Sequence, residues 1–444
     1  RRVGNPGRVL TQRLSTLRMT SSILARARVY AITASASALV LAACSDSDGT
    51  SLDTPPEHPA DPGPDPTTAP PGSAGAPSAG GNTGSGGVSG EVPQGSGGVD
   101  GETDGSGGDA PDGSDDDPVE LGPPGKPSRL MQERPLEPVA GGRWIYNPHR
   151  GGTNRYQGSG HTHAAPDHSN MDPRRQQERL RDLPGELKHH FVWMTAHLTV
   201  IPDPGVSGIT HLYGVENYTK KLPSGGAPHV VALLPDAKLV GRSQPFGLYN
   251  YTLTEMPARI EAEGGLAVLA HPSRYSPTIA ETVAVGDALW GIEVVSGGTS
   301  PAENLKYLDA RLSAGKYTCL TAGNDLHAAT SGLTTGYQHV SAESAEREEL
   351  FEAVRACNFF ACRADNERTA PVSEPTVRVV DGSVHVTMGR SGTIRYVTKN
   401  GAVRKTATGT SAEYAPSADD GYVRVEMSVP GAQCYSQPLW LMTP

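Results

Sequence analysis

The segment LAVLAHP, residues 266–272, is a short run of apolar residues that ends at a histidine. The same arrangement recurs in FVWMTAH at 191–197 and in YTCLTAGNDLH at 317–327. Short apolar runs of this kind are typical of strands that are buried on both faces of a parallel sheet. These segments therefore predict buried strands whose polar ends meet at one edge.

Helical patterns lie between the predicted strands. They are TEMPARIEAEG at 254–264, PAENLKYLDARLSAG at 301–315 and SAESAEREELFEAVRAC at 341–357. Strands that alternate with amphipathic helices predict β/α units and a parallel sheet. About seven such units within roughly 230 residues favour a closed α/β barrel over an open sheet. We expect this barrel at residues 128–370.

The periodicity changes to two after residue 371. Asp381-Gly382 and Asn400-Gly401 lie between alternating runs, and such dipeptides are strong hairpin signals. Residues 371–444 therefore predict a small antiparallel β domain, folded as a sandwich.

Histidines and carboxylates lie where the predicted strands stop. In His161-Thr162-His163, alternate residues of a strand point the same way, so both imidazoles can face one ion. The candidates that follow along the chain are His197, Glu216, His229, His271, Asp325 and His327. Because C-terminal strand ends of a β/α barrel converge on one face, we expect a divalent-metal site with mixed nitrogen and oxygen ligands.

Six other histidines are expected outside this site. His189 and His190 follow a charged amphipathic segment and are expected at the surface, and His385 belongs to the β domain. The histidines interpreted as structural are His149, His211 and His339.

The order His-x-His, Thr-x-His, Gly-x-Glu, His, His-Pro and Asp-x-His closely resembles the polymerase and histidinol phosphatase (PHP) superfamily of metal-dependent phosphoesterases. The resemblance covers about residues 155–330. In addition, YVRVEMSVPGAQCYSQPLWL at 422–441 is similar to the C-terminal end of the subgroup that includes carbaryl hydrolase. The resemblance implies a distorted (β/α)7 TIM-like barrel with two or three zinc, manganese or iron ions at its C-terminal face.

Carried over residue by residue, the resemblance implies a set of metal ligands in which Glu216 bridges two ions. The set is His161, His163, His197, Glu216, His229, His271, Asp325 and His327. The sequence departs from the family pattern twice. Ala196 stands where the family usually has Asp, which removes an orienting carboxylate, and His168 stands near another Asp position. Some trinuclear members use a third histidine there, so His168 is a further candidate ligand.

The resemblance implies a hydrolase that uses a metal-bound hydroxide at a di- or trinuclear site, with phosphate esters as the best-matched substrates. Asp325 is expected to act as both ligand and proton acceptor, with His327 beside it. Arg274 is expected to neutralise a phosphate oxygen, although a surface role is equally compatible with the sequence. The alternatives are a carboxyl or carbamate ester hydrolase on the same site, and a catalytically weak ligand-binding surface lipoprotein.

The first 44 residues resemble a bacterial lipoprotein signal. From a start at Met19, basic residues precede an apolar stretch that ends in Leu41-Ala42-Ala43-Cys44. This pattern predicts cleavage before Cys44, acylation of its thiol and anchoring of the exported protein in the outer membrane. An ordinary signal peptide or an N-terminal membrane anchor remains the alternative. Residues 45–127, rich in Gly, Pro, Ser and Asp, predict a disordered linker.

Net charge and cysteine spacing bear on the expected partners and on the state of the cysteines. The formal net charge of −10 argues against a general nucleic-acid binder. The partners that we expect are a small-molecule ester, from the family resemblance, and the membrane, from the lipoprotein signal. Four cysteines follow Cys44, and Cys357 and Cys362 could pair across a tight turn. Their spacing is not that of a zinc ribbon, so the sequence does not indicate a cysteine metal site.

Overall fold

The computed structural model describes residues 136–139, 143–149, 152–167, 169, 171–327, 332–373 and 375–442. The predicted signal region, the acylated Cys44, the linker and His168 lie outside these residues. Among the described residues, no helix is long and apolar enough to span a membrane.

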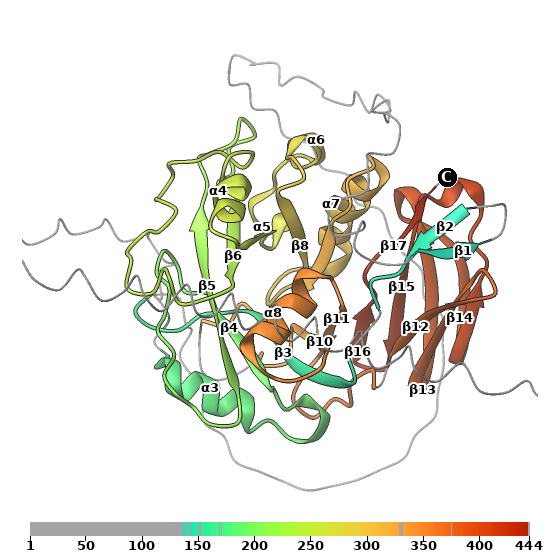
Figure 1. Cartoon of the computed structure of the whole chain (residues 1–444), viewed down its shortest axis with the longest axis horizontal. Helices are drawn as coiled ribbons and strands as arrows, with labels where there is room; N and C mark the ends of the chain where they lie inside the picture. The colour runs from blue at the N-terminus through green and yellow to red at the C-terminus, as the bar shows by residue number, and fades with distance from the viewer. Residues whose placement is uncertain are drawn as a thin grey trace, which may run out of the picture. The chain divides into compact units, whose positions relative to one another are not determined.

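The first part of the described chain alternates strands and helices, as predicted (Figure 1). Its strands are β3 (Asn154–Thr162), β4 (Phe191–Met194), β5 (Thr210–Tyr218), β6 (His229–Leu234), β7 (Leu266–Leu269), β8 (Leu289–Val295), β9 (Cys319–Ala322), β10 (Tyr337–Ala342) and β11 (Phe359–Ala364). Its helices are α3 (Pro173–Arg181), α4 (Met256–Ala262), α5 (Pro272–Tyr275), α6 (Ile279–Ala284), α7 (Pro301–Ser313) and α8 (Arg347–Arg355). The four residues of β7 are all buried, which explains why LAVL has no polar alternation.

The sheet is mixed rather than all-parallel. The pairs β3–β4, β4–β5, β7–β8 and β8–β9 are parallel, whereas β6 runs antiparallel to both β5 and β7. β10 is also antiparallel to β3 and to β11. The expectation of a wholly parallel sheet is therefore wrong, because β6 and β10 reverse direction.

The expected closed barrel is also wrong. No strand ladder of the described residues joins β9 to β3 or β11, so the sheet stays open beside β9. Side-chain amides satisfy the backbone there instead. The Gln437 amide accepts from Leu320 N at 2.9 Å and donates to Leu320 O at 2.7 Å. Gln338 Nε2 donates to Ala322 O at 3.3 Å. Because buried backbone groups need partners, these two glutamines allow β9 to end the sheet without a neighbouring strand.

The C-terminal strands continue this sheet. They are β12 (Thr376–Val380), β13 (Ser383–Thr398), β14 (Ala402–Tyr414), β15 (Tyr422–Val429), β16 (Ala432–Tyr435) and β17 (Leu439–Met442). The antiparallel ladder between β11 and β16 makes them continuous with the first part in a 17-stranded sheet. Antiparallel strands are confirmed here, but they are not set apart as a sandwich. The early strands β1 (Glu137–Val139) and β2 (Arg143–Tyr146) pair with each other, and β2 pairs with β17.

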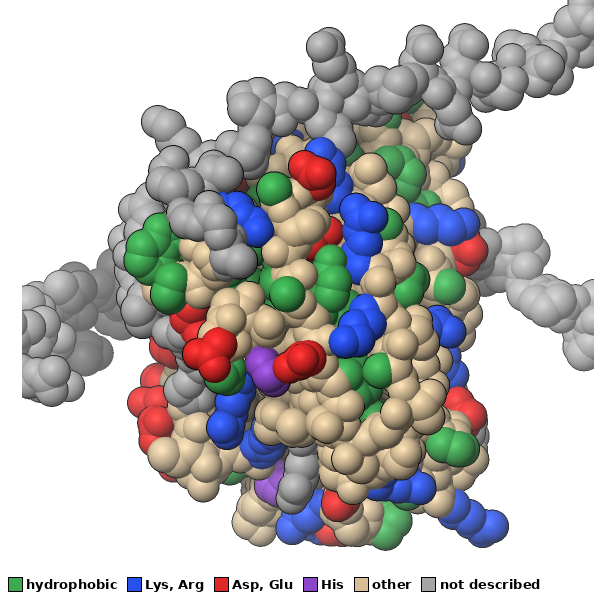
Figure 2. Space-filling model, turned by 90° about the vertical axis from the view of Figure 1, so that its right-hand side faces the viewer, with side chains coloured by type: hydrophobic (Ala, Val, Ile, Leu, Met, Phe, Trp, Pro, Cys, Tyr) green, Lys and Arg blue, Asp and Glu red, His purple; other side chains and the backbone are tan. Residues whose placement is uncertain are grey.

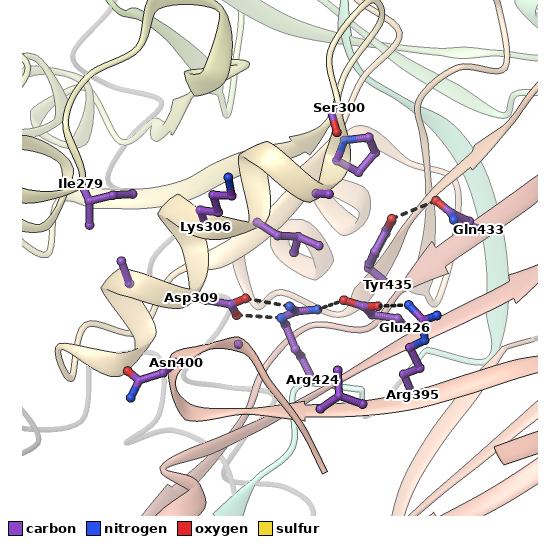
Figure 3. Close-up of a pocket in the computed structure, with 16 residues that line it drawn as sticks. Ile279, Ser300, Lys306, Asp309, Arg395, Asn400, Arg424, Glu426, Gln433 and Tyr435 are labelled. Atoms are coloured by element: carbon purple, nitrogen blue, oxygen red, sulfur yellow. Dashed lines mark hydrogen bonds and ion pairs between the residues drawn. The ribbon is translucent and has the colours of Figure 1, made fainter. Parts of the chain in front are cut away.

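A buried ion pair fastens α7 to β15 (Figure 3). The Arg424 guanidinium donates to both carboxylate oxygens of Asp309, at 2.8 and 2.7 Å, and to Glu426 at 2.6 Å. Tyr422 OH donates to the same Asp309 at 2.7 Å. Each guanidinium nitrogen and both Asp309 oxygens have a hydrogen-bond partner, and such partners are the condition under which a buried charge pair is tolerated.

Two cysteine pairs link distant strands. Cys319 at β9 is bonded to Cys357 after α8, and Cys362 on β11 is bonded to Cys434 on β16. The proposed pairing of Cys357 with Cys362 is therefore wrong. Cys362 lies directly opposite Cys434 in the strand register, a position from which the two side chains can reach each other across the strands.

Candidate metal centre

The sheet brings the predicted histidines and carboxylates to one edge. His161 ends β3 with His163 just beyond it, His197 follows β4, and Glu216 lies on β5. The segment after β7 supplies His271, and the segment after β9 supplies Asp325 and His327. The reversal of β6 matters here, because it turns His229, the first residue of that strand, towards the same edge.

Glu216 lies at the centre of the cluster and is fully buried. Its Oε1 lies 2.7 Å from His229 Nδ1 and 3.1 Å from His271 Nε2. Its Oε2 lies 3.2 Å from His163 Nε2, 3.3 Å from His197 Nδ1 and 3.4 Å from His161 Nε2. A single carboxylate is thus shared by five imidazoles.

Asp325 and His327 complete the cluster from the other side. Asp325 Oδ1 lies 3.2 Å from His163 Nε2 and 3.6 Å from His161 Nε2. His327 Nε2 lies 3.5 Å from His197 Nε2 and stacks on His163 with ring centroids 3.8 Å apart. The side chain of His327 is 27% exposed, so this ligand faces the opening of the site.

The ligand atoms fall into three overlapping groups, in each of which all atoms lie within 4.8 Å of one another. The groups are His161, Glu216, His271 and Asp325; His197, Glu216 and His229; and His163, His197 and His327. Glu216 belongs to the first two groups, and His197 belongs to the last two. Shared ligands between neighbouring groups are the arrangement of a multinuclear centre with nitrogen and oxygen donors.

One oxygen of each central carboxylate lacks a hydrogen-bond donor. Glu216 Oε2 and Asp325 Oδ1 are buried and accept no hydrogen bond, although imidazole nitrogens lie beside them. A buried anionic oxygen without a donor is costly, and a cation at this point would remove that cost. The donor set therefore fits divalent ions.

The pKa values show how negative the cluster is. Burial alone would lower the pKa of His161, but the nearby Glu293, Glu216 and Asp325 raise it well above its usual value. Burial opposes the same effect at His163, where the carboxylates of Asp167, Asp325 and Glu216 raise the pKa to about 10. Burial would raise the pKa of Glu216, yet His161 and His229 hold it well below its usual value. The buried carboxylates therefore stabilise positive charge on their neighbours, and bound divalent ions would supply this charge in place of protons.

Two carboxylates that sequence reasoning missed orient the first two histidines. Glu293 on β8 accepts from His161 Nδ1 at 3.0 Å and from the backbone N–H of His271 at 3.1 Å. Asp167 accepts from His163 Nδ1 at 2.8 Å and from the backbone N–H of His197 at 3.1 Å. A charged residue inside the apolar strand LWGIEVV was the available signal for Glu293, and the i, i+4 spacing from His163 was the signal for Asp167.

Local backbone geometry also serves the cluster. His271 has φ 27° and Asp325 has φ 46°, both in the left-handed region that is unfavourable for these residues. Such conformations are typical of functional sites. A Cβ at Gly323 would lie 2.2 Å from the Cβ of His161, so a glycine is needed for the end of β9 to approach β3.

Other predicted residues lie in different places. Arg274 stands at the rim, half-exposed, with its guanidinium 3.3 Å from Asp325 Oδ2. Ala196 is fully buried in the hydrophobic core. The expectation that His189 and His190 lie at the surface is wrong, because the bend before β4 turns both inward. His189 is fully buried and its Nδ1 donates to Leu187 O at 3.0 Å, whereas His190 is half-buried.

Comparison with known proteins finds distant similarities to solved structures. No family model matches the chain, and no curated protein matches it. Among solved structures, it is similar to a two-domain protein from Bacteroides vulgatus ATCC 8482 that contains a predicted PHP-like metal-dependent phosphoesterase. That match has 15% identity and a TM-score of 0.37, and it covers 66% of this chain and 97% of that chain.

Two further solved structures each cover 38% of this chain at 16% identity. One is an amidohydrolase from Chromobacterium violaceum with bound sulfate and no metal, with a TM-score of 0.28 over 86% of that chain. The other is a candidate metal-dependent phosphoesterase from Bifidobacterium adolescentis ATCC 15703, with a TM-score of 0.29 over 87% of that chain.

Proposed function

We propose that the chain is a metal-dependent hydrolase that cleaves phosphate esters. The observation that carries this proposal is the set of three overlapping ligand groups around Glu216, with buried carboxylate oxygens that lack donors. The donor set suits two or three zinc or manganese ions, and iron is compatible with it. When bound, such ions activate water for attack and offset the negative charge that develops on the ester.

The protein's own residues would hold and prepare the reactants. Asp325, between four histidines and the guanidinium of Arg274, is placed both to bind an ion and to accept a proton. His327, the most exposed of the eight described ligands, is placed to exchange that proton with solvent.

The opening of the histidine cluster, beside Arg274, has room for an ester. The half-exposed Arg274 can donate to an ester oxygen while its NH1 stays beside Asp325. Beside it lies a cavity of about 520 Å³, lined by Ser273, Arg274, Gly297, Gly298, Thr299, Ser300 and Glu303. This cavity is large enough for a small leaving group.

A carboxyl or carbamate ester is the second candidate substrate. The cavity beside Arg274 has one cationic side chain and one carboxylate, that of Glu303, on its lining. A doubly charged phosphate would be repelled by that carboxylate, whereas a neutral ester or a singly charged phosphodiester would be tolerated.

Hydrolysis of bis(p-nitrophenyl) phosphate and of p-nitrophenyl acetate by the zinc- or manganese-loaded chain separates the two candidates. We expect the phosphodiester to be the better substrate by kcat/KM, and Arg274→Met to lower that preference. The matched control is Arg259→Met on α4, which contacts Tyr251 and not the cluster. A metal-loaded protein that is inert on both substrates would leave a ligand-binding protein as the better interpretation.

We also propose that the protein is exported and anchored by lipid at Cys44. The sequence pattern at 41–44 is the support for this proposal. Acyl chains contribute about 0.8 kcal/mol per buried methylene, so Cys44→Ser is expected to release the protein from membranes. A Cys44→Ser protein that is still processed and still sediments with membranes would contradict the anchor.

On the face drawn in Figure 2, basic side chains lie among acidic, apolar and neutral ones and form no continuous stripe. This distribution is compatible with the expectation that nucleic acid is not the substrate.

A further inference from the structure

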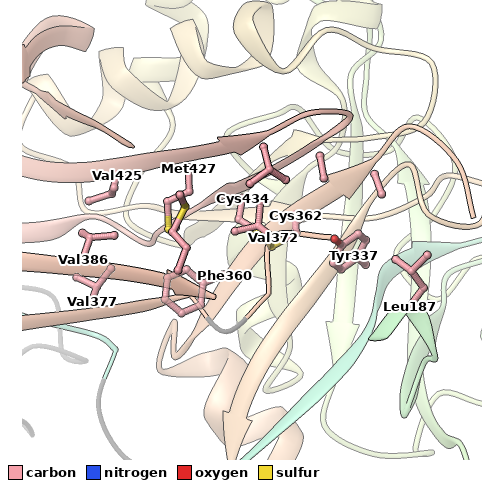
Figure 4. Packing of buried hydrophobic residues seen from close by; sticks show 14 of the residues in the cluster. Leu187, Tyr337, Phe360, Cys362, Val372, Val377, Val386, Val425, Met427 and Cys434 are labelled. Carbon is pink, nitrogen blue, oxygen red and sulfur yellow. A yellow bond between two sulfur atoms is a disulfide. The ribbon is translucent and has the colours of Figure 1, made fainter. Parts of the chain in front are cut away.

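A second group of metal-type ligands lies where β11 meets β16, and it shares no residue with the histidine cluster. Cys362 and Cys434 lie directly opposite each other on these strands, with Cα atoms 4.1 Å apart, and they form a disulfide (Figure 4). On the neighbouring strand β10, one ring nitrogen of His339 lies within 4.8 Å of both sulfur atoms.

The strand register explains this proximity. Tyr337 on β10 lies opposite Cys362, and His339 follows two residues later. Alternate residues of a strand share a face, so the imidazole lies on the same face of the sheet as both sulfurs. The sequence spacing gave no such indication, because Cys434 is 72 residues away from Cys362 along the chain.

The imidazole of His339 is available as a ligand. Its Nε2 is buried and has no hydrogen-bond partner. A neutral imidazole carries a free lone pair on one ring nitrogen, so a ring nitrogen without a protein partner can bind a cation.

We propose that the reduced thiols of Cys362 and Cys434, together with His339, form a second metal site for a thiophilic divalent cation of the zinc class. Zinc–sulfur bonds of about 2.3 Å and zinc–nitrogen bonds of about 2.0 Å place the ligand atoms of a tetrahedral site roughly 3.5–4 Å apart. The imidazole nitrogen, within 4.8 Å of both sulfurs, is compatible with that geometry once the sulfurs are no longer bonded to each other.

Formation of this site requires reduction by a dithiol. The dithiol supplies two electrons and two protons, the Cys362–Cys434 bond breaks to give two thiols, and the dithiol becomes its own disulfide. On binding the cation, both thiols release their protons to solvent, and the neutral imidazole donates a lone pair. In oxidising conditions the disulfide would thus join β11 to β16. In reducing conditions the bound metal would join the same two strands.

Cobalt(II) tests the proposal, because thiolate ligation to cobalt gives a near-ultraviolet charge-transfer band that histidine and carboxylate ligands do not give. The full chain with Cys44→Ser is reduced with dithiothreitol in denaturant, freed of reductant without air, and refolded with Co(II). In the reduced chain we expect about one equivalent of Co(II) to bind with a thiolate charge-transfer band. In the oxidised chain we expect this band to be absent. Circular dichroism monitors refolding.

Three variants identify the ligands. His339→Gln is expected to lower Co(II) affinity at this site at least about tenfold, and Cys434→Ser is expected to abolish the band. Cys357→Ser, in the other disulfide, is the matched control and is expected to leave the band intact. A reduced chain without the band, a band indifferent to His339→Gln and Cys434→Ser, or a reduced chain that does not refold with Co(II) would each overturn the proposal.

Discussion

Individual carboxylates decide how the histidines of the metal centre are oriented. Glu293 lies 3.0 Å from Nδ1 of His161, and Asp167 lies 2.8 Å from Nδ1 of His163. With the proton of each ring on Nδ1, the Nε2 atoms are left to face the cluster. Ligand spacing in the sequence could predict the histidines themselves, but not Glu293 as a partner, because it is 132 residues from His161.

Replacing Glu293 tests this orienting role. Glu293→Gln keeps the size of the side chain but weakens the acceptor and permits the wrong imidazole tautomer, so we expect metal affinity to fall about 10–100-fold. Isothermal titration of the metal-stripped chain with Zn(II) measures the effect. Glu303→Gln, an exposed carboxylate on α7 paired with Lys306, is the control. Equal affinity in Glu293→Gln and wild-type protein would show that Glu293 does not orient a ligand.

The structure explains why Ala196 can stand where the PHP pattern usually has Asp. Its methyl group is fully buried in the hydrophobic core, while Asp167 already accepts from the backbone of the adjacent His197. Ala196→Asp would bury a carboxylate without a partner, at a cost of several kcal/mol. We therefore expect a lower free energy of unfolding in urea and no gain in metal affinity. A stable Ala196→Asp protein that binds zinc more tightly would refute this interpretation.

For the strands β3 to β11, the sequence predicts where a strand lies along the chain but not in which direction it runs in the sheet. Apolar runs located β4, β7 and β9, because burial on both faces leaves a plain hydrophobic signature. The same runs contain no information on direction, so the reversal of β6 could not be predicted. The open edge at β9 depends on Gln437, a residue 117 positions away from Leu320, and no local pattern indicates it.

The contact between α7 and β15 predicts a specific loss of stability. Arg424→Met removes one partner of a buried pair and leaves Asp309 with only the Tyr422 hydroxyl, so we expect unfolding free energy to fall by about 3–5 kcal/mol. Asp309→Leu combined with Arg424→Met removes both charges and is expected to recover most of that loss. Urea denaturation followed by circular dichroism measures both. A double variant as unstable as Arg424→Met alone would mean that packing, not the buried charge, sets the cost.

Stability of the whole molecule depends on buried neutral histidines. Burial lowers the pKa of His189 and of His211 to about 4, whereas both titrate near 6.5 in the unfolded chain. The unfolded state therefore binds more protons between these values, and stability is lost as pH falls through that window. Each histidine contributes a loss of about 1.4 kcal/mol per pH unit.

Comparison of wild-type protein with His189→Gln isolates one of these contributions. The glutamine side chain cannot titrate but can still donate to Leu187 O, so we expect a smaller loss of unfolding free energy between about pH 6.5 and 4.5. Protonation of the metal ligands affects both proteins alike and cancels in the difference. Parallel pH dependences in the two proteins would contradict a neutral buried His189.

The central claim is that the described histidines and carboxylates form one metal centre that is required for hydrolysis. The most direct measurement is the metal content of the purified full chain and of Asp325→Ala, taken with bis(p-nitrophenyl) phosphate turnover of each. We expect about two to three equivalents of zinc, manganese or iron in the wild type, fewer in Asp325→Ala, and turnover lower by at least about 100-fold in the variant, with His385→Ala unchanged. Less than about one equivalent in the wild type, or full turnover in a metal-free Asp325→Ala protein, would contradict the assignment.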